Sequence, residues 1–371
     1  MTQDEKFRPQ GQLMSNKAST RLEYVESLRF IAAALVLFQH YIEQYSGLPL
    51  FHEIMQIGPG LSGVVIFFCV SGYVVPMSVR GRIDPLNFMI RRIFRVYPLM
   101  LAVFIFLFVA GSAGILAKWS FMADATAYQW LANILLLQEY VGAKPILGVT
   151  WTLAVEFVWY GLFALSLWRF GDRAGRILNF ALPLVILALT VASLVLGERL
   201  PLGRVNMIYA CVLGYQAYLL DSGKISLRTL GVSIIAFLAV TIISNLVAFG
   251  FYHHPQISLW QALWPWILGP LAFFAVVAMP QVRNARILNE GVLPRWGAAS
   301  YSIYIFHSIG LAAAAQYTTG IWAGSVVAIG LTAAMSFLGY RYVELKGVKL
   351  GQAFLKRFPP VARGALPPAA L

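Results

Sequence analysis

Repeated apolar runs of about twenty residues constrain the fold of this chain more than any other feature. A helix of that length crosses the hydrocarbon core of a bilayer. In lipid only helices and closed barrels satisfy their own backbone polar groups. Of 371 residues, 59% are hydrophobic and 12% charged, whereas charged residues make up about a quarter of a soluble domain. We predict an all-α polytopic membrane protein with about ten transmembrane helices, at residues 25–45, 57–79, 93–117, 151–168, 177–196, 205–220, 230–251, 259–279, 298–317 and 321–340.

The distribution of positive charge orients these spans. With both termini cytoplasmic, only Lys118, Lys144, Arg199 and Arg204 of the 28 lysines and arginines fall outside, and Arg29 lies within the first span. The excess of basic residues in cytoplasmic loops supports that orientation. The short run 130–138 within the 118–150 loop is therefore interpreted as interfacial or re-entrant, since a further span would destroy the asymmetry. A net charge of +13 thus indicates a basic cytoplasmic face, and no nucleic-acid partner is expected.

A single integral-membrane domain is expected at residues 23–345. A polar cytoplasmic tail, 1–22, precedes it with no cleaved signal peptide, and a basic Pro/Ala-rich cytoplasmic tail, 346–371, follows it and is expected to be disordered. Cys69 and Cys211 lie in apolar runs and are interpreted as small hydrophobic residues. The sequence predicts no metal site, because no ligand spacing typical of one occurs.

Arg29 and His40 are ionisable residues within the first apolar run, and such residues mark functional sites by default. At helical rise, His40 and Glu156 lie at a similar depth below the outer boundary. We expect the two to pair, with Glu156 orienting His40 as a general base, although Glu43 is a rival partner on the same helix. Arg29 is placed near the inner boundary, where pairing with Glu26 or reaching toward the surface explains it equally well.

Three arginines open the run at 93–117, in Arg91-Arg92-Ile-Phe-Arg95. Clustered guanidinium groups can bind phosphates, although an anchor on the cytoplasmic side is the simpler alternative. Ser71 could line a path through the membrane, or it could join Gly63 and Gly72 in allowing close helix packing.

Polar residues also occur in and beside other spans. His307 is expected near mid-membrane, either facing the same cavity as His40 or packed, and Tyr301 and Trp151 are further candidates for a cavity or an acceptor site. Glu344 is expected to pair with Arg341 three residues before it.

These segments together resemble the acyltransferase-3 family of bacterial membrane-bound O-acyltransferases, over residues 22 to 345. Any one of the segments is weak, but six in the family's order form a specific signal. Three departures from the family pattern are Val65 in place of a frequent aspartate, Lys346 in place of a common proline, and the lack of a periplasmic esterase-like domain, which is typical of the stand-alone type. The matching segments are Arg29-x10-His40, Phe67-Phe-x-x-Ser-Gly-Tyr73, Arg91-Arg-x-x-Arg-x-Tyr-Pro98, Trp151-Thr-Leu-x-x-Glu156, Ser300-Tyr-Ser-x-Tyr-x-x-His307 and Tyr340-Arg-Tyr-Val-Glu344.

The resemblance implies an O-acyltransferase of the bacterial inner membrane that acylates a cell-surface or exported glycan. It implies that Arg29 and His40 are an essential pair, that the three arginines contact the acyl-coenzyme A, and that Glu156 belongs to the site. Acetyl-coenzyme A is the expected co-substrate, a carbohydrate is the expected acceptor, and no permanently bound cofactor is expected. The alternative from the residues alone is a proton-coupled exporter or flippase of a sugar or lipid, against which no internal repeat is found. The acyl group, the acceptor hydroxyl, direct transfer versus an acyl-enzyme, and the oligomeric state stay open.

Overall fold

The computed structural model describes residues 22–44, 49–79, 83–252 and 257–358, which form helices and turns with no strand in these ranges. Residues 1–21 of the predicted N-terminal tail and residues 359–371 of the predicted C-terminal tail lie outside the described residues, as do Arg80, Arg82 and the loop histidines His253 and His254. The all-α fold class is confirmed.

Each predicted apolar run coincides with a long helix. Seven helical stretches of the described chain are long and apolar enough to cross a membrane, or eight if residues 286–297 and 300–317, bent by 60°, count as one span. A multi-pass membrane protein is confirmed, while the count of ten and the side of the termini stay predictions. The helices are α1 (Glu23–Gln44), α3 (Pro59–Met77), α4 (Pro85–Ser112), α6 (Trp151–Phe170), α7 (Ala174–Leu196), α8 (Leu202–Asp221), α9 (Leu227–Asn245), α10 (Leu259–Ala278), α14 (Ser300–Tyr317) and α15 (Ile321–Gly339).

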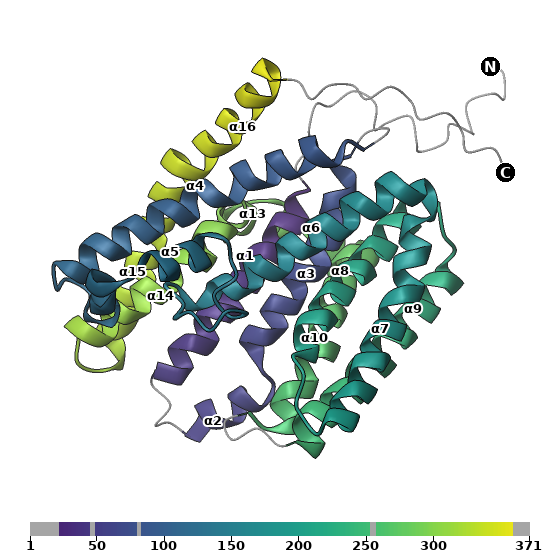
Figure 1. Cartoon of the computed structure of the whole chain (residues 1–371), viewed down its shortest axis with the longest axis horizontal. Helices are drawn as coiled ribbons and strands as arrows, with labels where there is room; N and C mark the ends of the chain where they lie inside the picture. The colour runs from purple at the N-terminus through teal and green to yellow at the C-terminus, as the bar shows by residue number, and fades with distance from the viewer. Residues whose placement is uncertain (1–21, 45–48, 80–82, 253–256, 359–371) are drawn as a thin grey trace.

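Helix α3 lies at the centre of the bundle, beside α1, α8 and α10 (Figure 1). Glycines allow this packing, because a Cβ at Gly72 would lie 1.7 Å from the Cys211 carbonyl oxygen and one at Gly63 would lie 2.5 Å from that of Ala32. The small-residue interpretation of this helix is therefore confirmed. Val65 is fully buried. It packs against Gly269 of α10, where an added Cβ would lie 2.7 Å from the Val65 Cγ1.

The N-terminal end of α1 is held by two short helices, α12 (Arg286–Asn289) and α13 (Val292–Gly297). Ser27 Oγ donates to the Leu288 carbonyl over 2.7 Å. A Cβ at Gly297 would lie 1.8 Å from the carbonyl oxygen of Glu26, so α13 touches the backbone of α1 next to Arg29. This contact holds the turn of α1 that carries Arg29.

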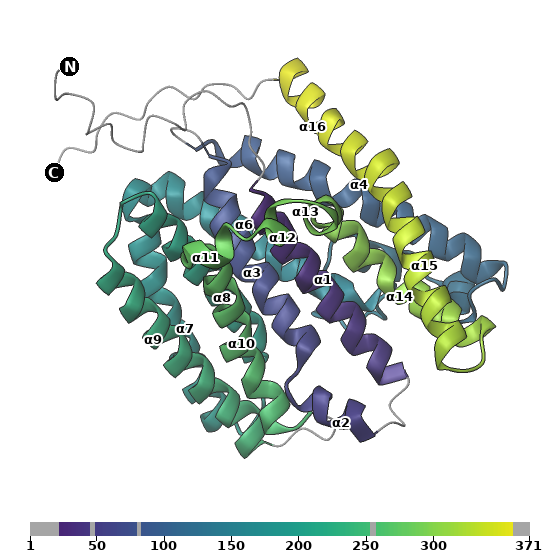
Figure 2. The same ribbon diagram turned by 180° about the vertical axis from the view of Figure 1, so that it is seen from behind.

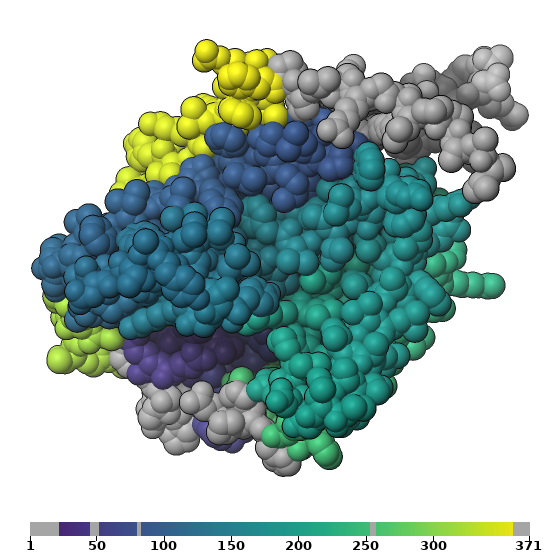
Figure 3. All heavy atoms as spheres, in the orientation of Figure 1, coloured from purple at the N-terminus to yellow at the C-terminus, as the bar shows by residue number. Residues whose placement is uncertain are grey.

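The 118–150 segment folds back over the C-terminal end of α4 without crossing the bundle. It contains the 3-10 helix η2 (Ala117–Asp124) and the eight-residue α5 (Ala127–Ile134), which is too short to span a bilayer. Trp119 Nε1 donates to the Ile146 carbonyl, and Asn133 bonds to both Lys144 and Ile146. In the space-filling view these segments and α4 form one mass, beneath which part of α1 stays uncovered (Figure 3).

The chain continues as a helix beyond α15. A π-helical turn, η6 (Tyr340–Glu344), leads into α16 (Leu345–Arg357), which lies along α4 (Figure 2). The expected disorder after residue 345 is therefore wrong for this stretch. Gly347 and Gly351 are buried, and a Cβ on either would come within 2.8 Å of Pro98 or Phe94 of α4, so close backbone packing stabilises the helix.

Candidate active site

Two polar centres lie along α1, one around Arg29 and one around His40. The two residues are eleven positions apart, which corresponds to about 16 Å along a helix axis. We name them the inner and the outer centre after the predicted orientation of the chain. The inner centre gathers arginines and glutamates from α1, α4, α6 and η6, and the outer centre gathers histidines and polar residues from α1, α3 and α14.

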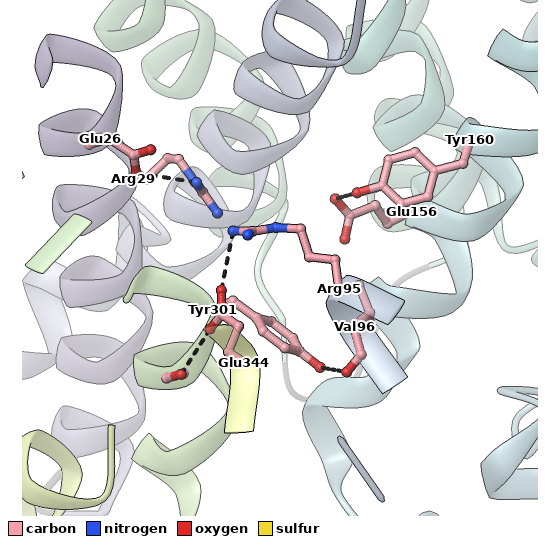
Figure 4. A network of polar contacts seen from close by, with 9 residues as sticks. Glu26, Arg29, Arg95, Val96, Glu156, Tyr160, Tyr301 and Glu344 are labelled. Carbon is pink, nitrogen blue, oxygen red and sulfur yellow. Dashed lines mark hydrogen bonds and ion pairs between the residues drawn. The ribbon is translucent and has the colours of Figure 1, made fainter. Parts of the chain in front are cut away.

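Two ion pairs build the inner centre. Arg29 lies 3.2 Å from Glu26 on the same helix, and Arg95 of α4 lies 3.2 Å from Glu344 of η6. Figure 4 shows the guanidinium groups of Arg29 and Arg95 pointing toward one another. Two like charges placed this close are compatible with folding because each arginine has its own carboxylate partner.

Glu344 is fully buried, and its second oxygen accepts a hydrogen bond from Ser302 Oγ at 3.0 Å. Its partner is Arg95, so the expected pairing with Arg341 is wrong. The π-helical turn explains the difference, since widening the helix at 340–344 changes which residues face inward. Tyr301, a candidate for an acceptor site, instead donates to the Val96 carbonyl at 2.8 Å and joins α14 to α4 beside Arg95 (Figure 4).

Glu156 belongs to the inner centre. Its Oε1 accepts a hydrogen bond from Tyr160 at 2.5 Å and a longer one from Ser71 at 3.4 Å. The Arg92 guanidinium lies over the Tyr160 ring at 5.1 Å and donates to Ser78 Oγ at 2.8 Å. Ser71 of α3, Glu156 and Tyr160 of α6, and Arg92 of α4 therefore form one connected group.

The three clustered arginines of α4 separate into two kinds. Arg95 is tied to a buried glutamate, while Arg91 is exposed and Arg92 is half-buried near the end of α3. Neither Arg91 nor Arg92 has a carboxylate within ion-pair distance among the described residues. The capacity to bind an added anion thus lies with Arg91 and Arg92.

The outer centre is a histidine–carboxylate pair on α1. His40 Nδ1 lies 2.7 Å from Glu43 Oε2, and Gln39 Nε2 donates to Glu43 Oε1 at 2.9 Å. The side-chain Oε1 of Gln39 accepts a hydrogen bond of 2.6 Å from the backbone N–H of Gly60, in the first turn of α3. A carboxylate only accepts, so the neutral imidazole carries its proton on Nδ1 and presents a lone pair on Nε2.

The expected pairing of His40 with Glu156 is wrong, since the hydrogen bonds of each residue are to other partners. Equal depth along two helix axes does not fix the direction in which each side chain points. Glu43, the rival partner, is the carboxylate that contacts His40. The functional roles assigned to both glutamates stay predictions.

His307 of α14 stacks on His40, with ring centroids 5.3 Å apart and an angle of 12° between the planes. The two histidines are thus packed against each other, while the shared cavity named for them stays a prediction. Tyr304 lies beside it and is bonded to Thr152 of α6 over 2.9 Å. Trp151 begins α6 one residue before Thr152, and it lines a narrow crevice with Tyr140 and Arg204 on the side of the 118–150 segment.

Gln39 and Ser302 are among the site residues that the sequence did not single out. Gln39 and Glu43 are four residues apart on one helix face, a spacing that could have predicted their bond. Ser302 pairs with Glu344 across 42 residues, and no local pattern gives that contact. Cys69 and Cys211 are both buried and free, and the described residues contain no group of three or more potential metal ligands.

Comparison with known proteins identifies the family. The acyltransferase-3 profile, described as an acyltransferase domain, matches residues 22–341. The chain is 26% identical over 325 residues to the exopolysaccharide production protein ExoZ of Rhizobium meliloti (strain 1021), with 77% of this chain and 87% of that protein covered. It is 28% identical over 171 residues to nodulation protein 10 of Rhizobium leguminosarum bv. viciae, covering 40% of this chain and 46% of the relative. No solved structure matches the chain. The chain therefore belongs to the acyltransferase-3 family.

Proposed function

We propose that this protein moves an acyl group, in the simplest case acetyl, from cytoplasmic acyl-coenzyme A to a sugar hydroxyl of an exported or cell-surface glycan, in the inner membrane of a bacterium. The observation that carries the proposal is the pair of polar centres along α1. An anion-binding group lies toward one end of the helix and a histidine–carboxylate pair toward the other. A reaction that joins a phosphate-bearing donor to a hydroxyl acceptor needs both.

The donor is assigned to the inner centre. Arg91 and Arg92 have no carboxylate within ion-pair distance among the described residues and can take the phosphates of coenzyme A. Arg95 and Arg29 lie deeper, and each is neutralised by a glutamate. We assign them to the wall that the pantetheine arm passes, together with Ser71, because a neutralised ion pair can line a path without trapping the phosphates.

The chemistry is assigned to His40. The acceptor hydroxyl oxygen attacks the thioester carbonyl carbon, the C–S bond breaks, and the hydroxyl proton passes through His40 Nε2 to the departing thiolate. The products are an ester and free coenzyme A, so atoms and charge balance with no further reactant. Glu43 stabilises the imidazolium that forms and holds the ring by its Nδ1–H, as a carboxylate partner does in a catalytic histidine pair.

A covalent acyl-histidine is the competing route. Rapid-quench measurement with acyl-coenzyme A and no acceptor separates the two routes. Direct transfer predicts no stoichiometric burst of free coenzyme A, and a burst equal to the enzyme concentration supports the acyl-histidine.

The experiment that tests the function uses protein purified into lipid nanodiscs, radiolabelled acetyl-coenzyme A, and surface glycan isolated from a strain lacking this protein. Wild-type protein is expected to transfer label to the glycan. Arg92→Ala is expected to raise the donor KM by about tenfold, the worth of one charged hydrogen bond. Arg286→Ala is the matched control, because Arg286 pairs with Glu290 on an exposed turn. No transfer by the wild-type protein would refute the proposed function.

The export alternative has no observation in its favour in this structure. The comparisons place the chain in an acyltransferase family. The relative that matches over 325 residues, ExoZ, is named for exopolysaccharide production. Flux of glycan precursors through proteoliposomes in the absence of acyl-coenzyme A would restore it.

A further inference from the structure

The hydrogen bonding of His307 leaves one ring nitrogen free. Its side chain is 1% exposed, and Nδ1 lies 2.7 Å from the Tyr304 carbonyl oxygen. A carbonyl only accepts, so Nδ1 carries the hydrogen and Nε2 of the neutral ring carries a lone pair. That Nε2 is buried and has no hydrogen-bond partner within the described part of the chain.

His40, which stacks on His307, has the same arrangement of donor and acceptor nitrogens. Its Nδ1–H is directed to Glu43, so Nε2 again presents a lone pair. The two rings are nearly parallel and stacked. Acceptor nitrogens on two stacked rings fit a ligand with two O–H donors, because a single hydroxyl has only one hydrogen to give.

Gln44 adds an unpaired donor to the same region. It lies one turn beyond His40 on α1 and so on the same helix face. Its amide nitrogen Nε2 is buried and finds no acceptor among the described residues. Buried polar atoms are normally hydrogen-bonded, so an unpaired acceptor and an unpaired donor flanking His40 point to a ligand that both donates and accepts, as hydroxyl groups do.

We propose that His307 and Gln44 form a hydroxyl-binding subsite beside His40, and that the acceptor is a sugar with two neighbouring hydroxyls. One hydroxyl gives its proton to His40 Nε2 and is acylated. The neighbouring hydroxyl donates to His307 Nε2 and accepts from the Gln44 amide. This assignment rests on the proposed function and specifies the substrate class of that site. It also gives His307 a contact with the acceptor that packing alone would not require.

The test measures acceptor and donor KM separately, with the same nanodisc protein and glycan from the strain lacking this protein. His307→Phe keeps a flat ring for stacking but removes the lone pair, so it is expected to raise the KM for the glycan at least tenfold and to leave the donor KM unchanged. His307→Gln offers an amide oxygen as acceptor and is expected to recover most of that loss. His52→Phe, an exposed histidine on α2 (Pro49–Gln56), is the matched control and is expected to behave as wild type.

Two further measurements keep the proposal falsifiable if His307→Phe does not fold. Gln44→Leu is expected to raise the glycan KM about threefold to tenfold. Periodate, which cleaves between neighbouring free hydroxyls, is expected to destroy the acceptor activity of the glycan before transfer. A glycan KM within twofold of wild type in every folded variant, or a periodate-treated glycan that still accepts, would overturn the subsite. In both cases continued transfer by the wild-type protein would leave the proposed function standing.

Discussion

Glu43 Oε2 lies 2.7 Å from His40 Nδ1, three residues apart on one helix. The pair is held from the other side by Gln39, which links Glu43 to the first turn of α3. Because both residues of the pair lie on α1, the geometry of the pair depends on that helix and on the contact of Gln39 with α3. This arrangement gives the proposed general base a fixed tautomer without a contact to Glu156.

Replacing the carboxylate of the pair is expected to affect the chemical step. Glu43→Gln keeps the shape but removes the charge that stabilises the imidazolium, so we expect kcat to fall by about a hundredfold, within the usual range for general acid–base catalysis. The donor KM should stay within twofold of wild type. Steady-state kinetics of purified protein measures both, with Glu53→Gln, on exposed α2, as control. A kcat equal to wild type would exclude the pair from catalysis.

Glu156 is expected to respond differently from Glu43. Glu156→Gln retains an oxygen that can accept the Tyr160 hydrogen bond, and it removes a negative charge next to Arg92. We therefore expect kcat within about tenfold of wild type and a donor KM no higher than wild type, because the phosphates meet a more positive site. A kcat loss as large as that of Glu43→Gln would return Glu156 to the chemical step.

The buried Arg95–Glu344 pair is expected to stabilise the fold. Glu344→Gln leaves Arg95 without a charged partner, and Arg95 is partly exposed, which lowers the penalty. We expect a loss of about 1–3 kcal/mol, read as a lower melting temperature in detergent. Glu290→Gln, in an exposed pair with Arg286 of α12, is the control and should change stability little. Equal melting temperatures for the two variants would contradict a stabilising role for the buried pair.

Contact between α3 and α8 depends on Gly72. Gly72→Val would place a branched side chain where the Cβ alone meets the Cys211 carbonyl oxygen at 1.7 Å. Overpacking of this kind costs about 1–3 kcal/mol or more, so a lower melting temperature and a lower folded yield are expected. Gly161→Ala is the control, since nothing lies within 4 Å of its added Cβ. Unchanged stability of Gly72→Val would mean that the helices are further apart than described.

The helices were predictable because each apolar run carries its own signal of length and composition. Arg29 and His40 were also predictable as site residues, since an ionisable side chain is unusual in an apolar run. The partners of the glutamates were not. The number of residues from the end of each helix predicts a similar depth for His40 and Glu156. It does not predict the direction in which each side chain points from its helix axis.

Other differences arise from contacts distant in sequence. Glu344 pairs with Arg95, 249 positions away. Arg341, only three residues before Glu344, offered a local partner, and the sequence therefore predicted that pair instead. The proline- and alanine-rich residues that follow α16 favoured a prediction of disorder for the whole tail. Its own glycines, Gly347 and Gly351, weaken a helix in isolation, and they become favourable only where they let α16 pack closely on α4.

The central claim is that donor binding and chemistry occupy separate centres along α1, and His40→Ala tests it most directly. Equilibrium binding of coenzyme A and single-turnover transfer would be measured on the same preparation. We predict a coenzyme A Kd within twofold of wild type and transfer below about one per cent of the wild-type rate, a loss within the range of general-base catalysis. Wild-type transfer, or loss of coenzyme A binding together with transfer, would contradict the account.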